Sequence, residues 1–452
     1  MRPADRGAWL GGWEKAALGG LALAALLFGV LVEVRSCFLS RRMGDLDCYL
    51  RAAWAVRTGR DLYAVTDEHR WHYNYPPLLA ILLVPLADPP PGADRSGMVP
   101  YPVAVAIWYL FNLACVALSV HWLASAVEQT AADPAVRRQP AGCRRWWALR
   151  VLPVLACLTP IGHTLMRGQV NLLVLALLSA AAAGLLRGRS LRAGFCLAGA
   201  ACLKVIPAFL VLFLLWKRDG RCLLGFIGGM LVGVVLIPAA VFGPGQTVTH
   251  YRTYAQVLLA PALVGGADQS RARELLAAEA TFSQSLPSTL HNLLHPDPQT
   301  RPRFPTPALR AGAWLVGLLL TAGTLWRGRR VRADNGLPAL LVFGALAVLM
   351  LLLSPVCHRH YFCLALPLAL ALIAGAWERK QFPALEVMPA LVLAINLAIL
   401  TLTHLPGGEW LRDTGAATFA ALLLWLTALV QLGRASPANR RVLPAPIPLL
   451  AA

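Results

Sequence analysis

The stretch that decides the fold runs through residues 337–377 and reads LPALLVFGALAVLMLLLSPVCHRHYFCLALPLALALIAGAW. Two runs without a charged residue, 337–353 and 361–377, flank the short polar link SPVCHRH. A helix needs about 20 apolar residues to cross about 30 Å of hydrocarbon. The stretch therefore predicts two membrane helices, joined by a turn that carries two histidines and an arginine.

The composition of the whole chain agrees with this prediction. Hydrophobic residues make up 58% of the 452 residues and charged residues only 14%, whereas soluble domains carry about 25% charged residues. Such a chain has too few polar groups to cover a surface in water. The composition indicates a polytopic membrane protein and excludes a soluble enzyme, a disordered scaffold and a secreted disulfide module.

Other apolar runs extend the bundle to an expected 11 to 13 membrane helices in an all-α fold. Segment 76–87 is too short for a confident span, and segment 193–216 holds Lys204 and Pro207 in its middle. The remaining candidates are approximately 16–33, 101–125, 147–161, 170–186, 222–243, 308–326, 385–403 and 414–432.

The basic residues predict the orientation of the chain. They outnumber the acidic residues by 41 to 22 and gather in short clusters between apolar runs. This pattern is typical of cytoplasmic loops and of contact with anionic lipid, not of nucleic-acid binding. The amino terminus is then cytoplasmic in a cell membrane, provided that 76–87 does not cross and 193–216 returns as a hairpin with Lys204 near its tip. The competing count makes both segments full spans.

With this orientation, residues 1–435 form a single membrane domain with two large exterior segments, about 34–100 and 244–306, and 436–452 form a disordered cytoplasmic tail. Most histidines then lie outside or at the outer membrane edge: His69, His72, His163, His250, His291, His295, His358, His360 and His404. The polar chemistry is therefore expected on one face of the membrane.

The first exterior segment begins with a predicted amphipathic helix in the membrane interface. Leu46, Tyr49 and Leu50 start an apolar pattern at helical spacing, and Arg51 lies off that face. Asp45 stands at the start of this helix, where it is either an N-cap or a carboxylate held beside a membrane cavity. The two roles are compatible, because capping also fixes the direction of the side chain.

Lys204 and the 354–360 link supply positive charge to the predicted exterior face. An ammonium within an apolar hairpin either lines an anion-binding cavity or snorkels to the interface. His358, Arg359 and His360 offer no third zinc ligand in a fixed frame, so an anion site is the better interpretation. Cys37 and Cys48 lie in one exterior stretch, and the sequence is compatible with a disulfide or with two thiols.

Seven short motifs, in this order and spacing, resemble glycosyltransferase family 87, a group of polyprenyl-phosphate-mannose-dependent membrane enzymes. They are Asp45 to Tyr49 with Ala52-Ala53, Gly59 to Tyr63, Tyr75-Pro76-Pro77-Leu78, Gly168-Gln169-Val170-Asn171, Leu203 to Pro207, Gln284-Ser285-Leu286, and Ser354-Pro355 with His360. The chain departs from the family pattern at Ser283, at His291-Asn292 and in the 357–360 sequence.

The resemblance implies a GT-C-type helical bundle that transfers a hexose, mannose by analogy, from a polyprenyl-phosphate donor to a hydroxyl of a glycolipid or glycan. The transfer is expected to invert the anomeric configuration and to need no cofactor. A divalent metal remains compatible with the sequence. The resemblance also implies Asp45 as general base with Asp47 in reserve. The residues expected to bind the donor phosphate and the substrates are Lys204, His360, Arg359, His358, His163, Gln169, Asn171, Tyr49, Tyr75 and Gln284.

Two rival functions are compatible with the sequence. A transporter or flippase would place charges near the membrane midplane and often shows internal repeats, but the polar residues here gather outside, apart from Lys204. A non-catalytic assembly protein that keeps the fold is the second rival, because the region around Gln284 departs from the family pattern.

Overall fold

The computed structural model describes residues 12–39, 42–130, 144–264, 271, 282–329, 331, 336–378 and 383–434. Within these ranges the regular structure is helical, and β-structure is limited to two isolated bridges, Thr66 with His72 and Ser283 with His358. The all-helical class predicted from the sequence is confirmed. The predicted tail, 436–452, lies outside the described residues.

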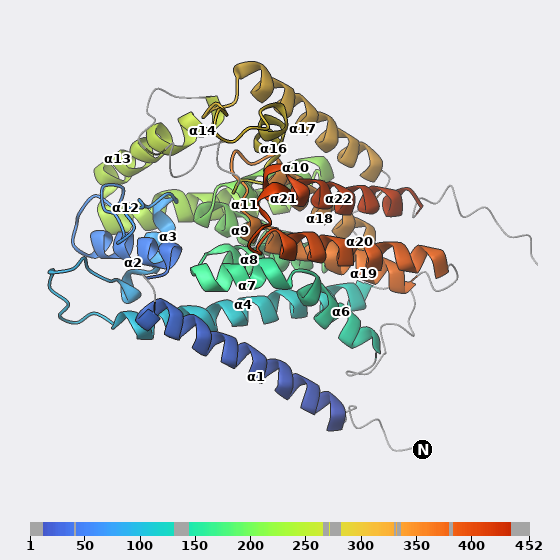
Figure 1. The fold of residues 1–452 in the computed structure, drawn as a ribbon, viewed down its shortest axis with the longest axis horizontal. Coiled ribbons are helices and arrows are strands. Elements are labelled where there is room, and N and C mark those ends of the chain that lie inside the picture. Colours follow the sequence, from blue (N-terminus) through green and yellow to red (C-terminus); the bar gives the residue numbers. More distant parts are fainter. Residues whose placement is uncertain are drawn as a thin grey trace, which may run out of the picture.

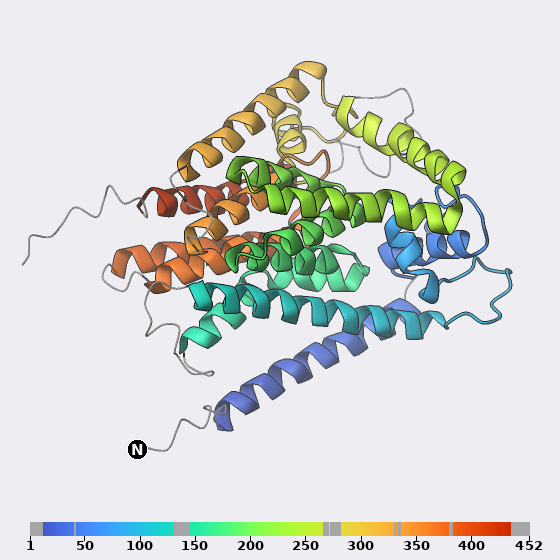
Figure 2. The same cartoon turned by 180° about the vertical axis from the view of Figure 1, so that it is seen from behind.

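Six helices among the described residues are long and apolar enough to cross a membrane, which confirms the multi-pass architecture. Figures 1 and 2 show α4, α11, α19 and α22 running roughly along the long axis of the molecule. The elements that form the six spans are α1 Gly12–Val34 with η1 Arg35–Leu39, α4 Tyr101–Thr130, α11 Gly220–Met230 with η4 Leu231–Leu236 and α12 Ile237–Phe242, α17 Pro307–Gly328, η6 Arg359–Ala365 with α19 Leu366–Glu378, and α22 Ala416–Arg434.

Shorter apolar helices fill the space between the long ones. They are α6 Arg144–Ala156, α7 Leu158–Arg167, α8 Asn171–Leu186, α9 Ser190–Leu203, η3 Ile206–Leu210, α10 Val211–Lys217, α18 Gly336–Leu352 and α20 Pro383–Leu402. The total of 11 to 13 spans stays a prediction, because it depends on how many of these shorter helices cross the membrane.

The predicted span 147–161 is broken, since α6 and α7 meet at an angle of 60°. Pro160 lies in the first turn of α7 and has no N–H to donate to the carbonyl of Ala156, the last residue of α6. A proline also disfavours helical geometry at the residue before it. The turn that follows α7 contacts residues 44–57, since Arg167 and Gln169 both bind Asp45.

Segment 193–216 reverses direction, as the hairpin prediction requires. Helices α9 and α11 run side by side in the same direction, because Leu191 lies against Gly225, Ala198 against Gly229 and Cys202 against Gly233. Residues 204–217 must therefore return toward the starting side before α11 begins. The reversal lies at Lys204, whose backbone is extended between α9 and η3.

Helix α18 forms the core of the bundle. Fifteen of its seventeen residues are buried, so it has no lipid-facing stripe, as expected of a helix that is apolar all round. Helix α1 is the opposite case, with only 6% of its apolar window buried inside the protein. The bundle is thus organised around α18, with α1 at its edge.

Helices α2 and α3 and the α12–α13 corner lie together at one end of the bundle (left in Figure 1). The described elements of the segments predicted to be exterior are α2 Gly44–Arg57, α3 Pro77–Leu82, η2 Val84–Leu86, α13 Pro244–Tyr254, η5 Ala255–Leu259, α14 Ala260–Val264, α16 Leu286–Leu294 and α21 Glu409–Asp413. The short α3 confirms that 76–87 does not form a membrane-spanning helix.

Helix α2 differs from its prediction in one respect. The sequence predicts one buried face, but every residue from Leu46 to Ala55 is buried, including Arg51. Arg51 is tolerated there because its guanidinium lies 4.0 Å from the carboxylate of Asp47. Helix α2 is therefore enclosed by protein and does not lie with one polar face open to water.

Candidate active site

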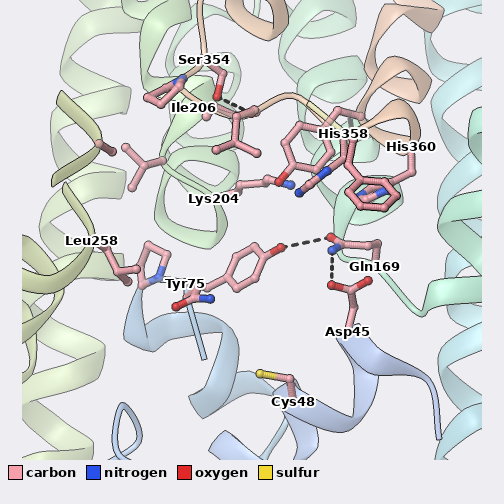
Figure 3. Close-up of a pocket in the computed structure, with 18 of the residues that line it drawn as sticks. Asp45, Cys48, Tyr75, Gln169, Lys204, Ile206, Leu258, Ser354, His358 and His360 are labelled. Atoms are coloured by element: carbon pink, nitrogen blue, oxygen red, sulfur yellow. Dashed lines mark hydrogen bonds between the residues drawn. The ribbon is translucent and has the colours of Figure 1, made fainter. Parts of the chain in front are cut away.

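A cavity of about 610 Å³ opens where α2, the α7–α8 turn, the α9–η3 break and the 354–361 link meet (Figure 3). Most of the residues expected at the site line this cavity: Asp45, Tyr49, Tyr75, His163, Gln169, Lys204, His358, Arg359 and His360. These side chains come from five separate regions of the sequence, residues 45–49, 75, 163–169, 204 and 358–360. The fold thus brings the acidic Asp45 together with Lys204 and the basic residues of the 354–360 link, as the motifs predict.

Asp45 lies in the first turn of α2, with its side chain 18% exposed. The N-cap of α2 is Met43, and no side chain caps the helix, so the N-cap interpretation of Asp45 is wrong. Its carboxylate instead accepts a hydrogen bond from Nε of Arg167 at 2.5 Å and one from Nε2 of Gln169 at 2.6 Å. The turn between α7 and α8 therefore fixes the direction of this carboxylate.

Gln169 links Asp45 to two tyrosines. Its Oε1 accepts hydrogen bonds from the hydroxyls of Tyr49 at 3.0 Å and Tyr75 at 3.2 Å. Burial raises the pKa of both phenols, so both remain protonated donors. Because a carboxylate accepts and does not donate, the amide nitrogen of Gln169 is directed at Asp45, and its carbonyl oxygen accepts from the two phenols (Figure 3).

Gly168 allows this turn to approach α2 closely. Its φ is +69°, in the left-handed region, and a Cβ there would lie 2.5 Å from Cβ of Leu46. The Gly168 carbonyl also accepts a hydrogen bond of 2.8 Å from Nε1 of Trp108 in α4. Only glycine combines this backbone conformation with this contact, which explains the glycine in the Gly168-Gln169-Val170-Asn171 motif.

Lys204 extends into the cavity toward His358 and His360, across from Tyr75 (Figure 3). The residue is only 6% exposed. Its Nζ donates to Oδ1 of Asn171 at 2.7 Å and lies 3.4 Å from the centre of the Tyr361 ring. The structure thus favours the cavity-lining interpretation over snorkelling, and Asn171 holds the lysine without itself lining the cavity.

Three histidines form the wall beside Lys204. The ring of His360 lies 5.4 Å from the rings of both His163 and His358. Burial lowers the pKa of His358 to about 4, so this ring is neutral at physiological pH. His360 is 2% exposed and neither of its ring nitrogens has a hydrogen-bond partner, so it can donate to or accept from a bound molecule.

Besides Asn171, two residues expected at the site do not line the cavity. Asp47 is fully buried and forms an ion pair of 3.0 Å with Arg42, away from the cavity lining. Gln284 is also buried; its backbone N–H donates to the carbonyl of Cys357 at 2.6 Å and its Nε2 to the carbonyl of Arg412 at 2.7 Å. Asp47 therefore anchors α2, and Gln284 supports the 354–360 link from behind.

Several residues that line the cavity are not among those predicted from the sequence. Arg167 is the most important, because it is the ion-pair partner of Asp45. The only signal in the sequence was its place as the single basic residue of the 161–169 link. Others form an aromatic and apolar wall: Tyr361, Ile206, Phe209, Leu258, Leu259 and Trp314.

A transmembrane helical bundle with an acid, a buried lysine and three histidines around one cavity is compatible with a membrane group-transfer enzyme. The sequence profile of glycosyltransferase family 87 matches residues 73–355. Since this is more than half of the chain, the protein belongs to glycosyltransferase family 87, and the resemblance seen in its motifs is confirmed.

One curated relative is the polyprenol-phosphate-mannose-dependent alpha-(1-2)-phosphatidylinositol mannoside mannosyltransferase of Mycobacterium tuberculosis. It is 27% identical over 356 residues, which cover 75% of this chain and 71% of the relative. Two solved structures of ArnT from Cupriavidus metallidurans, one bound to undecaprenyl phosphate and one in the apo state, are similar to 92% of this chain and 77% of theirs. Their sequence identities are 14% and 13%, and the TM-scores are 0.38 and 0.42.

Proposed function

We propose that this membrane glycosyltransferase moves a hexose, mannose in the first instance, from a polyprenyl-phosphate donor to a hydroxyl of a glycolipid acceptor. The observation that carries the proposal is the single cavity shared by Asp45, Lys204 and His360. The family and the name of the mycobacterial relative support the donor and a phosphatidylinositol mannoside type of acceptor.

The proposed reaction is a single displacement with inversion. Asp45 accepts the proton of the acceptor hydroxyl while the acceptor oxygen forms a bond to the anomeric carbon of the donor. The bond between that carbon and the phosphate oxygen breaks, and its electron pair remains on the departing polyprenyl phosphate. This leaving group is already anionic, so the reaction needs no general acid and calls on no cofactor.

The departing phosphate requires positive or donor groups, which the opposite wall supplies. The ammonium of Lys204 and a ring N–H of His360 both face the cavity, and Arg359 lines it as well. Preorganised donors of this kind stabilise developing charge without reorganisation at the moment of reaction. The apolar wall around Leu258 and Trp314 is suited to the first isoprene units of the donor.

The site is proposed to face the exterior of the cell membrane, with the amino terminus in the cytoplasm. The distribution of basic clusters supports this orientation. Formation of a glycosylated product distinguishes this function from the two rivals. A flippase would move a lipid without changing it, and an assembly protein would form no product.

The test is transfer of radiolabelled mannose from polyprenyl-phosphate mannose to a glycolipid acceptor by the purified protein, with NMR of the product for inversion. Asp45→Asn should reduce kcat by about 10²- to 10⁴-fold, the range of a lost general base. The matched control is Asp94→Asn, an exposed aspartate of the 34–100 segment that does not line the cavity, which should keep kcat near that of the wild type. Normal transfer by the Asp45→Asn protein would refute the assignment.

A further inference from the structure

One buried side chain connects the candidate base to two other parts of the fold. Gln169 is only 3% exposed and lies in the turn between α7 and α8. Its Nε2 donates to Oδ1 of Asp45, while its Oε1 accepts from Tyr49 in the same helix and from Tyr75 shortly before α3. Both ends of the Gln169 amide are thus bound by protein groups (Figure 3).

The spacing of Asp45 and Tyr49 explains how one side chain reaches both residues. Residues four positions apart in an α-helix lie on the same face, about one turn from each other. Helix α2 begins at Gly44, so it presents a carboxylate and a phenol on one face to the α7–α8 turn. The close approach of Gly168 to this helix brings the Gln169 amide within reach of both groups.

The phenols favour the same orientation of the Gln169 amide as the carboxylate does. A reversed amide would place its Oε1 against Oδ1 of Asp45, so two acceptors would face each other. The reversal would also remove the oxygen that accepts from Tyr49 and Tyr75. The two phenols therefore stabilise the orientation in which Gln169 donates to the candidate base.

The carboxylate of Asp45 is held at both of its oxygens. Oδ1 accepts from Gln169 and Oδ2 accepts from Arg167. An ionised carboxylate has about four acceptor positions, so each oxygen can still accept from another donor. Because Asp45 lines the cavity and its side chain is 18% exposed, an acceptor hydroxyl that enters the cavity can reach it.

We propose that Gln169 is a positioning residue for the base, and that Tyr49 and Tyr75 act through Gln169 and not on a substrate. This inference rests on the proposed function and replaces the substrate-binding role expected for these three residues from the sequence. The phenols hold the amide, the amide holds Oδ1 of Asp45, and the carboxylate meets the acceptor hydroxyl without first having to turn. A group that is oriented in advance in this way contributes to kcat more than to substrate affinity.

The first experiment measures transfer from polyprenyl-phosphate mannose to phosphatidylinositol mannoside by the full chain in nanodiscs. Gln169→Glu keeps the shape of the side chain and an acceptor for both phenols, but it replaces the donor to Asp45 with a second carboxylate. Its kcat should fall about 10- to 100-fold, the value of a lost hydrogen bond to a charged group, while the KM of each substrate stays within about twofold. Gln169→Leu should show a similar loss.

A different result would overturn the inference. A kcat of Gln169→Glu near that of the wild type would show that donation to Asp45 is not needed. A raised KM with an unchanged kcat would show that Gln169 binds a substrate, because lost substrate binding that is equal in the ground and transition states raises KM alone.

The second experiment removes the phenol hydroxyls. Tyr49→Phe and Tyr75→Phe each leave one phenol on Oε1 and should lower kcat by no more than about threefold. The double variant should lower kcat by more than the product of the single effects, and the same two changes should have little further effect in Gln169→Leu. The matched control is Tyr109→Phe, a buried tyrosine of α4 that donates to the carbonyl of Ala25 outside the cavity and should keep kcat unchanged. Equal losses in the wild-type and Gln169→Leu backgrounds would overturn the inference.

The thermal midpoint tests the same chain of hydrogen bonds without transfer. Loss of both hydroxyls of Tyr49 and Tyr75 should lower the midpoint of the wild type more than that of Gln169→Leu, because the phenols have already lost their acceptor in that variant. Additive shifts would overturn the inference whether or not sugar is transferred. If the wild type transfers no sugar, the proposed function fails, and coupled shifts would still support the connection between the phenols and Gln169. The two failures are therefore distinguishable.

Discussion

Replacing Gly168 with alanine should displace Asp45, and the loss of activity should exceed what the loss of stability explains. A Cβ at Gly168 would lie 2.5 Å from Cβ of Leu46, the residue that follows Asp45 in α2. Restoring a tight but allowed contact of 3.4 Å requires α2 or the turn to move by about 0.9 Å. That movement changes the position of the carboxylate relative to the cavity.

The expected magnitudes follow from these two features. Holding an alanine in the left-handed region costs about 1 to 2 kcal/mol of folding stability. A misplacement of about 1 Å at a reacting group costs about 100-fold in rate. Gly168→Ala should therefore lower kcat for mannose transfer about 100-fold in the fraction of protein that remains folded.

Gly188→Ala is the matched control. Gly188 also has a φ of +69°, but nothing lies within 4 Å of a Cβ at that position. Gly188→Ala should therefore have the backbone strain without the steric contact. Its thermal midpoint should be lower than that of the wild type, and its kcat should be nearly unchanged. The assay compares kcat and the thermal midpoint of both variants in the same detergent. Equal kcat values for the two variants would refute the argument that Gly168 positions Asp45.

Two further predictions concern the opposite wall of the cavity. Lys204→Ala should raise the donor KM at least about tenfold, the value of a lost charged hydrogen bond. The control variant Lys217→Ala, outside the cavity, should leave the donor KM unchanged. An unchanged donor KM in Lys204→Ala would show that Lys204 does not bind the donor phosphate. Burial lowers the pKa of His358 from 6.5 to about 4, so its contribution to stability is complete above pH 6.5 and is lost as the pH falls toward 4. The thermal midpoint of the wild type should therefore fall more steeply over this interval than that of His358→Asn, and parallel curves would contradict a neutral ring.

Much of the fold could be predicted because membrane spans are long, apolar and locally encoded. The reversal at Lys204 was also predictable, since a lysine and a proline within an apolar run disfavour a straight span and the basic clusters require a return. The break between α6 and α7 was not predicted, although Pro160 is visible in the sequence. A proline near a helix start can either begin a helix or end the one before it, and only the packed fold decides.

The site was predictable at the level of motifs but not of individual contacts. Asp45 and Asp47 are two positions apart, so they point about 200° apart around the helix. The sequence does not say which side faces the cavity. The ion pair between Asp45 and Arg167 joins residues 122 positions apart, and no local pattern encodes such a pair. No local pattern encodes the burial of α2 on all sides either, because this burial depends on contacts with the loop that follows α2.

The packing of α18 has a consequence for the assembly of the protein. This helix is apolar enough to enter lipid by itself, yet in the folded protein its neighbours have replaced lipid on every side. Exchange of lipid contacts for protein contacts yields no hydrophobic gain. Close van der Waals packing must therefore hold α18 in the bundle. Gly344, whose Cβ position is only 2.7 Å from Cα of Leu368 in α19, allows the backbones of these two helices to touch. A larger side chain at this position should leave insertion into the membrane intact but should prevent α18 and α19 from packing against each other.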